Sequence, residues 1–353
     1  MSVLIYNYFR ATSSKVSQIF WCSTLPQQVT KKNTGKVVNV AIIGAPNSGK
    51  STLINKILNR KICAASNKVH TTTKLTRAFC YENDTQIIFL DTPGVVSNKE
   101  QKKYKLPDAM IGACEKSLRC ADVIGVVHDI SNRWMKDSLH ADVLCMLNMA
   151  NEIPSFLILN KIDRLKSKKQ LLTTIRNLTN GVIAGNPIPS AAPSHSNSDT
   201  KNPVQGYSKF SDVFLVSALN GDGVQDIKEY LINNSKPANF QYSPDMWTDQ
   251  TPETLIEEAV RAKLLDFLPQ EIPYKLNSQL EYYEELEEEN KVICSVSVEC
   301  PSERIITLIS GAGGGRLQQI KSHVRNDLID MLQKSVILDI KLKVKSKPSL
   351  SIE

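Results

Sequence analysis

The segment at residues 44–51, which reads GAPNSGKS, constrains the fold of this 353-residue chain more than any other feature. It follows the apolar run VVNVAIIG that starts at Val37, which is typical of a buried strand, and it precedes a helical stretch at 51–58. Glycines let backbone N–H groups turn inward around phosphate oxygens, and a helix N-terminus favours negative charge. Strand, loop and helix in this order predict a phosphate-binding P-loop.

The residue types in this loop predict how a nucleotide and its metal ion would be held. Lys50 is expected to reach the β- and γ-phosphates, and Ser51 to bind Mg²⁺. Asp91 begins the segment DTPG directly after the apolar run IIFL, so its carboxylate is expected to hold Mg²⁺ through water. The further predicted phosphate-binding residues are Gly44, Asn47, Ser48, Gly49, Thr52 and Gly94.

Two more motifs at strand ends predict which base is bound. The segment NKID starts at Asn160 after the apolar run FLIL, and a carboxylate at Asp163 can accept hydrogen bonds from both N1–H and N2–H₂ of guanine. Adenine lacks that donor arrangement, so GTP is favoured over ATP. The guanine-binding residues are predicted to be Asn160, Lys161 and Asp163, together with backbone N–H groups near guanine O6 in the strand-end segment Ser217, Ala218 and Leu219.

Further apolar runs at 87–90, 123–127, 156–159 and 213–216 are spaced to leave room for crossover helices, such as 106–118 and 138–149. This pattern predicts an α/β domain over residues 37–235, with a mainly parallel sheet and helices on both faces. Residues 185–211 are rich in Ser, Pro and Asn, and we expect them to form a flexible insertion.

The pattern changes after residue 235. A linker at 236–252 is followed by a helix at 253–268, strands at 274–283 and 291–299, two helices around the loop GAGG, and a strand at 336–344. The order αββααβ predicts a small α+β domain over 253–347. A GxxG loop between two helices is the arrangement with which KH domains clamp single-stranded RNA, although a simple turn is the alternative.

The expected RNA-binding residues of this loop and the following helix are Gly311, Ala312, Gly313, Gly314, Arg316 and Lys321. Charge supports the interpretation, because residues 304–347 carry nine Lys and Arg against three Asp, which is 9 − 3 = +6. The net charge of the chain is +7, but five of those charges lie in residues 1–36, which contain no acidic residue. Bulk charge is therefore weak evidence for a polyanionic partner.

That basic, acid-free stretch at 1–36 mixes Ser, Thr and aromatic residues, which is typical of a mitochondrial transit segment, with a disordered tail as the alternative. A matrix location follows from the first interpretation. The eight cysteines have no metal-ligand spacing, and no apolar run approaches the roughly 20 residues of a membrane-spanning helix, so we expect no transmembrane segment.

The motifs GAPNSGKS, the threonines at 71–73, DTPGV and NKID resemble those of the Era GTPases, and the GxxG loop with its αββααβ order resembles their type II KH domain. The resemblance implies GTP hydrolysis to GDP, Mg²⁺, and binding of small-subunit ribosomal RNA near its 3′ end during assembly of the small mitoribosomal subunit. A peripheral association with the inner membrane is a further expectation. By the same resemblance Thr72 would be the switch I ligand of Mg²⁺, with Thr71 as the alternative.

The sequence departs from the family at His70, at Thr73 and at Ala312, where the family usually has Gln, Arg and Lys. Val95 follows DTPG and cannot orient water, so another group must offset the transition-state charge. By the resemblance, Asn47 would help hold a K⁺ ion, and the catalytic set would be Lys50, Thr72 and Asn47. An RNA chaperone with negligible hydrolysis is the alternative function, and the double-Era GTPases are disfavoured because one P-loop occurs.

Overall fold

The computed structural model describes residues 34–345, except for 65, 67–75, 93–116, 133, 166, 168–169, 190–204 and 270. The transit segment predicted at 1–36 lies almost wholly outside these residues. Thr71, Thr72, Gly94 and Val95 also lie outside them, as does nearly all of the helix expected at 106–118. No helix among the described residues is both long enough and apolar enough to cross a membrane.

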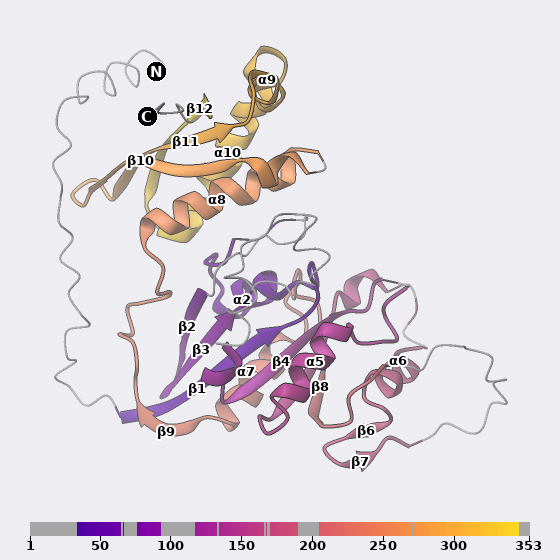
Figure 1. The fold of residues 1–353 in the computed structure, drawn as a ribbon. Helices are drawn as coiled ribbons and strands as arrows, with labels where there is room; N and C mark the ends of the chain where they lie inside the picture. Colours follow the sequence, from indigo (N-terminus) through magenta and orange to yellow (C-terminus); the bar gives the residue numbers. More distant parts are fainter. Residues whose placement is uncertain are drawn as a thin grey trace, which may run out of the picture. The chain divides into compact units, whose positions relative to one another are not determined.

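The larger sheet has seven strands in the order β2-β3-β1-β4-β5-β8, with β9 pairing with the first residues of β1 (Figure 1). Strands β1, β3, β4, β5 and β8 are parallel, whereas β2 and β9 run antiparallel to their neighbours. The mainly parallel sheet predicted from the apolar runs is therefore confirmed. Its strands are β1 (Thr34–Ile43), β2 (Thr76–Glu82), β3 (Thr85–Asp91), β4 (Val123–Asp129), β5 (Ser155–Asn160), β8 (Phe210–Val216) and β9 (Lys236–Asn239).

Helices cover both faces of this sheet, because the side chains of each central strand alternate between two cores. Val40 and Ile42 of β1 pack with α2 and α7, while Ala41 and Ile43 pack on the other side with α5 and α6. The helices are α2 (Lys50–Leu58), α5 (Ala141–Met149), α6 (Leu171–Leu178) and α7 (Val224–Asn233). Helix α5 begins three residues later than the predicted start at 138, because the side chain of His140 caps it.

The segment at 236–252, predicted as a linker, is packed against the larger sheet over much of its length. After β9, Tyr81 Oη donates hydrogen bonds to the carbonyls of Tyr242 (3.0 Å) and Ser243 (2.7 Å), and the ring of Phe79 stacks on Tyr242. The backbone N–H of Phe79 donates to the carbonyl of Trp247 at 2.8 Å. The connection to the second sheet is therefore built into the surface of the first domain.

The predicted flexible insertion at 185–211 has structured ends. A short hairpin joins β6 (Val182–Ile183) to β7 (Asn186–Pro187), and Tyr207 and Phe210 are buried in the core beside α6. The backbone of β7 is thus paired although its side chains are exposed, and Tyr207 and Phe210 are packed, which the composition of the insertion did not indicate. The flexibility of the insertion stays a prediction. The middle of the insertion, 190–204, lies outside the described residues.

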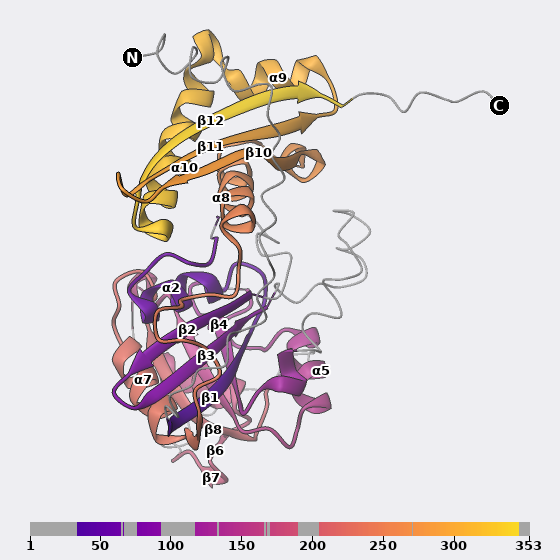
Figure 2. The same cartoon turned by 90° about the vertical axis from the view of Figure 1, so that its left-hand side faces the viewer.

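The second sheet has the strand order β10-β11-β12, with β10 antiparallel and β12 parallel to β11 (Figure 2). Its elements follow the predicted order αββααβ, and their apolar side chains form a core of their own. The predicted strand at 274–283 starts later because a 3₁₀ turn, η2 (Ile272–Lys275), precedes it. The elements are α8 (Pro252–Phe267), β10 (Asn277–Leu286), β11 (Lys291–Cys300), α9 (Glu303–Ser310), α10 (Gly315–Leu332) and β12 (Ser335–Val344).

Candidate guanine-nucleotide and RNA sites

The P-loop lies between the carboxyl end of β1 and the first residue of α2, as the sequence predicted. Gly49 caps the helix with φ = 101°, and a Cβ there would lie 2.3 Å from Asn160 Nδ2. Only glycine therefore allows the side chain of Asn160 to approach the loop. Asn47 has φ = 59°, a left-handed conformation that asparagine tolerates better than most residues.

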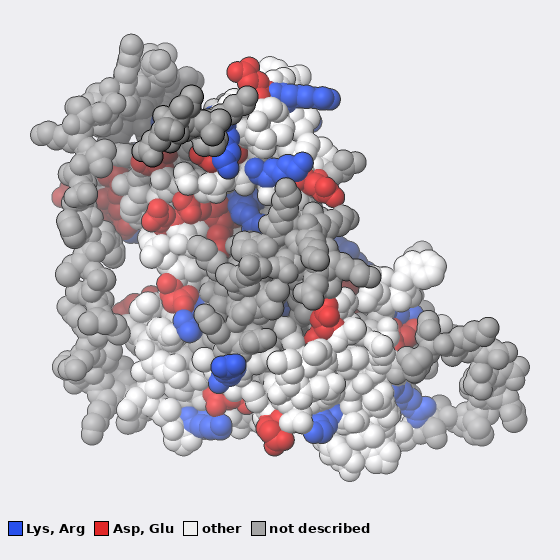
Figure 3. Space-filling model, viewed as in Figure 1, with Lys and Arg blue, Asp and Glu red and all other residues white. Residues whose placement is uncertain are grey.

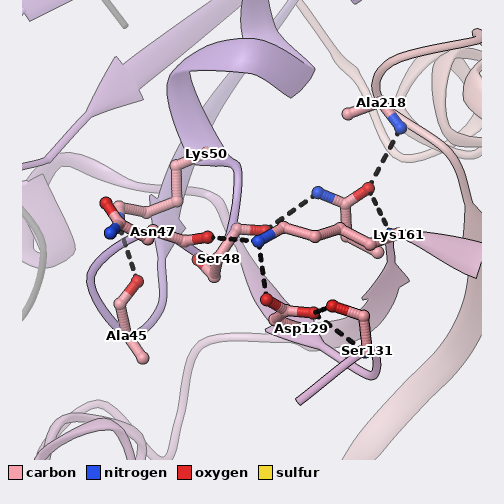
Figure 4. Close-up of polar contacts among 9 residues, drawn as sticks. Ala45, Asn47, Ser48, Lys50, Asp129, Ser131, Lys161 and Ala218 are labelled. Carbon is pink, nitrogen blue, oxygen red and sulfur yellow. Dashed lines mark hydrogen bonds and ion pairs between the residues drawn. The ribbon is translucent and has the colours of Figure 1, made fainter. Parts of the chain in front are cut away.

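Lys50 folds back over this loop from the start of α2 (Figure 4). Its side chain is buried, and its Nζ donates to the carbonyls of Gly44 and Ala45, both at 3.1 Å. An ammonium group held there is suited to bridging the outer phosphates of a bound nucleotide, because those phosphates follow the inner face of such a loop.

Ser51 and Asp91 are brought together by the parallel pairing of β1 and β3. Ser51 Oγ donates to Asp91 Oδ2 at 2.9 Å, and the Asp91 side chain is fully buried. One hydroxyl and one carboxylate beside the phosphate loop are hard oxygen donors of the type that Mg²⁺ prefers. These two residues therefore fit the predicted metal ion, which would neutralise phosphate charge.

Cys63 lies beside the same carboxylate, which the sequence did not indicate. Burial raises the pKa of the Cys63 thiol well above its ordinary value, and the nearby Asp91 carboxylate raises it further. The thiol is therefore neutral at physiological pH, and it lies buried next to one of the two predicted metal ligands.

Asn160 links the three segments of the predicted guanine site. Its Nδ2 donates to the carbonyl of Ser48 at 2.9 Å, and its Oδ1 accepts from the backbone N–H groups of Lys161 (2.8 Å) and Ala218 (3.0 Å) (Figure 4). The N–H of Ala218 is thus engaged by Asn160 in this structure, and its predicted contact with guanine O6 stays a prediction.

Asp163 lies in the short 3₁₀ helix η1 (Ile162–Arg164), just after the end of β5. Its Oδ1 accepts a hydrogen bond from Ser217 Oγ at 2.6 Å, so the hydroxyl orients the carboxylate. Asp163 and Leu219 line a cavity of about 400 Å³ that also includes Asn47 and Gly49. The cavity joins the predicted base site to the phosphate loop, and its volume is in the range of small-ligand sites.

Asp129, at the end of β4, contacts a predicted guanine-binding residue, and no sequence motif pointed to it. Its Oδ2 lies 2.6 Å from Lys161 Nζ, which also donates to the carbonyl of Asn47 at 2.7 Å. The position of this aspartate at the end of an apolar run could have marked it as a candidate site residue, but it belongs to no recognised motif. Only the parallel pairing of β4 with β5 brings the two residues together.

The predicted RNA loop joins α9 to α10 through the 3₁₀ turn η3 (Ala312–Gly314). Gly311, Gly313 and Gly314 all have positive φ, at 71°, 58° and 77°. A Cβ on Gly311 would lie 2.8 Å from Arg316 Cβ, whereas no described heavy atom lies within 4 Å of a Cβ on Gly313 or Gly314. The backbone of the last two glycines is thus open to a close partner.

Two basic residues predicted to bind RNA have partners within the second domain. Arg316 Nη1 donates to the carbonyl of Leu308 at 2.6 Å, which braces the loop against α9. Lys321 Nζ forms an ion pair with Asp339 of β12 at 2.7 Å. Their roles in RNA binding stay predictions. To bind a phosphate, each side chain would have to keep its present partner as well or give it up.

The acidic run at 281–289 is only partly at the tip of the hairpin between β10 and β11. Glu281 and Glu285 lie within β10, where they form ion pairs with lysines of β12 and the turn before it, namely Lys334, Lys341 and Lys343. These pairs reduce the basic excess expected from residues 304–347 alone. On the face drawn in Figure 3, acidic and basic side chains of the described residues are interspersed.

The fold and the first of these sites define a P-loop GTP-binding protein with a second, KH-like α+β domain. A family model described as "50S ribosome-binding GTPase" matches residues 39–161. The chain is 33% identical to "GTPase Era, mitochondrial" of Salmo salar over 92% of this chain and 80% of that protein. The corresponding protein of Danio rerio is also 33% identical, over 92% of this chain and 78% of its own length.

A crystal structure described as "Era in complex with MgGDPNP and nucleotides 1506-1542 of 16S ribosomal RNA" matches with a TM-score of 0.71 and 26% identity. The match covers 89% of this chain and 95% of that chain. A single-residue variant of Aquifex aeolicus Era bound to GDP.AlF4⁻ matches with the same TM-score and identity, over 88% and 95% of the two chains. The chain belongs to the Era GTPase family, and it is a GTPase.

Proposed function

We propose that this GTPase acts in the mitochondrial matrix, where it binds small-subunit ribosomal RNA near its 3′ end during assembly of the small mitoribosomal subunit. The observation that carries the proposal is the match, over both domains, to an Era structure that holds a 16S rRNA segment. The mitochondrial names of the Salmo salar and Danio rerio relatives support the location. The acid-free segment at 1–36 is consistent with import.

The nucleotide site and the RNA loop have separate tasks in this proposal. Lys50 and the backbone N–H groups of the P-loop bind the phosphates, and Ser51 and Asp91 hold Mg²⁺. Bound GTP orders the segments that contain Thr72 and Gly94, and hydrolysis releases them. The loop at 311–314 receives the backbone of single-stranded RNA, so the nucleotide state times the arrival and departure of the protein.

Ultraviolet crosslinking in isolated mitochondria tests this function. After the outer membrane is opened, protease removes proteins outside the inner membrane, and a matrix protein should be protected. The RNA crosslinked to the protected protein should be enriched for the 3′ end of small-subunit rRNA. Protein recovered with the inner membrane should be released by a high-salt wash if its association is peripheral. Crosslinks spread evenly over mitochondrial transcripts would contradict specific rRNA binding, and a protease-sensitive protein would contradict the location.

We also propose that a K⁺ ion held with the help of Asn47 offsets transition-state charge during hydrolysis. Hydrolysis should then be several-fold faster in K⁺ than in Na⁺ at equal ionic strength. Since Asn47 has φ = 59°, Asn47→Gly removes the side chain without the strain that Asn47→Ala would add. Both variants should abolish the difference between the two salts. Equal single-turnover rates of the wild-type protein in K⁺ and Na⁺ would rule out the ion.

A further inference from the structure

The carboxylate of Asp129 divides its two oxygens between a local turn and a distant lysine. Oδ1 accepts from the backbone N–H and the hydroxyl of Ser131, at 2.9 and 2.6 Å. Oδ2 faces Lys161 Nζ at 2.6 Å (Figure 4). The two Ser131 bonds determine the rotation of the carboxylate, and this rotation directs the second oxygen toward the lysine.

The carboxylate is ionised under all physiological conditions. Burial by itself would raise the pKa of Asp129, but the hydrogen bonds from Lys161 and Ser131 outweigh it and lower the pKa below its ordinary value. The side chains of Asp129 and Lys161 are only 23% and 21% exposed, so solvent screens their attraction less than it does at an open surface.

Lys161 would be poorly held without this carboxylate. Its long side chain has several freely rotating bonds, and ordering it costs conformational entropy. The second acceptor that the structure gives its ammonium group is the neutral carbonyl of Asn47, at 2.7 Å. A charged partner as well as this carbonyl makes the ammonium position well defined, so that it can hold the carbonyl in place.

The P-loop is consequently anchored at two successive carbonyls by two successive residues. Asn160 Nδ2 binds the carbonyl of Ser48, and Lys161 Nζ binds the carbonyl of Asn47. These two bonds hold the peptide units on either side of Ser48 in one orientation, with the Ser48 N–H donating to the carbonyl of Ala45 at 3.3 Å. The loop conformation that would receive phosphates depends on this orientation. Any loosening of Lys161 therefore loosens the backbone that binds the nucleotide.

We propose that Asp129 is a positioning residue of the guanine-nucleotide site, which acts through Lys161 to hold the Asn47 carbonyl and thereby the shape of the P-loop. It does not contact the nucleotide itself in this role. This role of Asp129 involves the GTP site alone and does not depend on the proposed RNA binding.

The test compares Asp129→Ala with the wild-type protein in nucleotide binding and turnover. GDP and GTP should both bind about tenfold more weakly, the size expected for loss of one charge-assisted hydrogen bond, with most of the change in the dissociation rate. Because Asp163 still reads the base, the preference for GTP over xanthosine triphosphate should not change. Hydrolysis at saturating GTP should fall much less than nucleotide affinity.

A double-mutant cycle separates positioning from general destabilisation. In a Lys161→Met background, Asp129→Ala should have almost no further effect on nucleotide affinity, because the residue through which it acts is gone. Asp129→Asn, which keeps an acceptor for Lys161 but loses the charge, should be intermediate. Additive losses in the cycle would overturn the proposal, as would wild-type affinity in a folded Asp129→Ala protein.

Asp122, just before the other end of β4, provides a matched control. Its carboxylate also pairs with a lysine, Lys236, at 3.0 Å and accepts from Asn39, and its side chain is 26% exposed. Asp122→Ala removes a lysine–aspartate pair just before the start of β4, at the opposite end of the strand from Asp129, although Lys236 is 71% exposed where Lys161 is 21% exposed. It should lower the melting temperature, though less than Asp129→Ala because its lysine is more exposed, without changing nucleotide affinity. Equal affinity losses in both variants would mean that Asp129 is merely structural.

Discussion

Asp163→Asn is expected to weaken GTP binding by about 10²- to 10³-fold and to make xanthosine triphosphate the preferred nucleotide. A carboxylate accepts both N1–H and N2–H₂ of guanine, whereas an amide offers one acceptor and one donor. Xanthine carries a carbonyl oxygen in place of the N2 amine and so matches the amide. The loss is large for two reasons. The variant removes a charge-assisted hydrogen bond, and it places the amide N–H₂ donor against the N2–H₂ donor of guanine.

Competition of each triphosphate against a fluorescent GDP analogue measures this exchange. Ser217→Ala removes the hydroxyl that orients Asp163 and should weaken GTP by only several-fold, without a change of base preference. Asp137→Asn is the matched control, since Asp137 accepts a hydroxyl hydrogen bond from Thr174 at the same distance of 2.6 Å but outside the site. If Asp163→Asn kept the wild-type preference for GTP, the guanine site would lie elsewhere.

Gly314→Asp is expected to weaken binding of single-stranded rRNA by at least about tenfold. The new carboxylate would lie on the loop where phosphates must approach, and the repulsion opposes them directly. The variant should fold, because φ is 77° at Gly314 and Asp tolerates the left-handed region better than most residues. The position also caps α10, where a short acidic side chain stabilises the helix.

Gly314→Asn separates charge from size, because it adds a side chain of the same shape without the negative charge. It should cost much less RNA affinity than Gly314→Asp, and neither variant should change GTP binding. Ala312→Lys should do the reverse of Gly314→Asp, tightening binding and steepening its salt dependence by roughly one phosphate contact.

Anisotropy titrations with a fragment from the 3′ end of small-subunit rRNA, at two salt concentrations, measure these RNA effects. Circular dichroism confirms folding. A folded Gly314→Asp protein with wild-type RNA affinity would show that the loop is only a turn between two helices.

The sequence by itself determined the nucleotide class, the mainly parallel sheet and the αββααβ order of the second domain. These features depend on local signals. A P-loop is a contiguous segment whose glycines, lysine and serine act within one turn of a helix, and NKID is a contiguous segment at one strand end. Apolar runs that are buried on both sides of a parallel sheet are likewise visible along the chain.

The tertiary structure alone decided which residues support these motifs. Asp129 meets Lys161 because β4 pairs with β5, Cys63 lies next to Asp91, and the glutamates of β10 form ion pairs with lysines near and within β12. The segment after residue 236 likewise packs on β2 and is not a solvent-exposed linker at that point. Each of these contacts joins residues far apart in the chain, and strand order and register, which no local pattern of side chains records, bring them together.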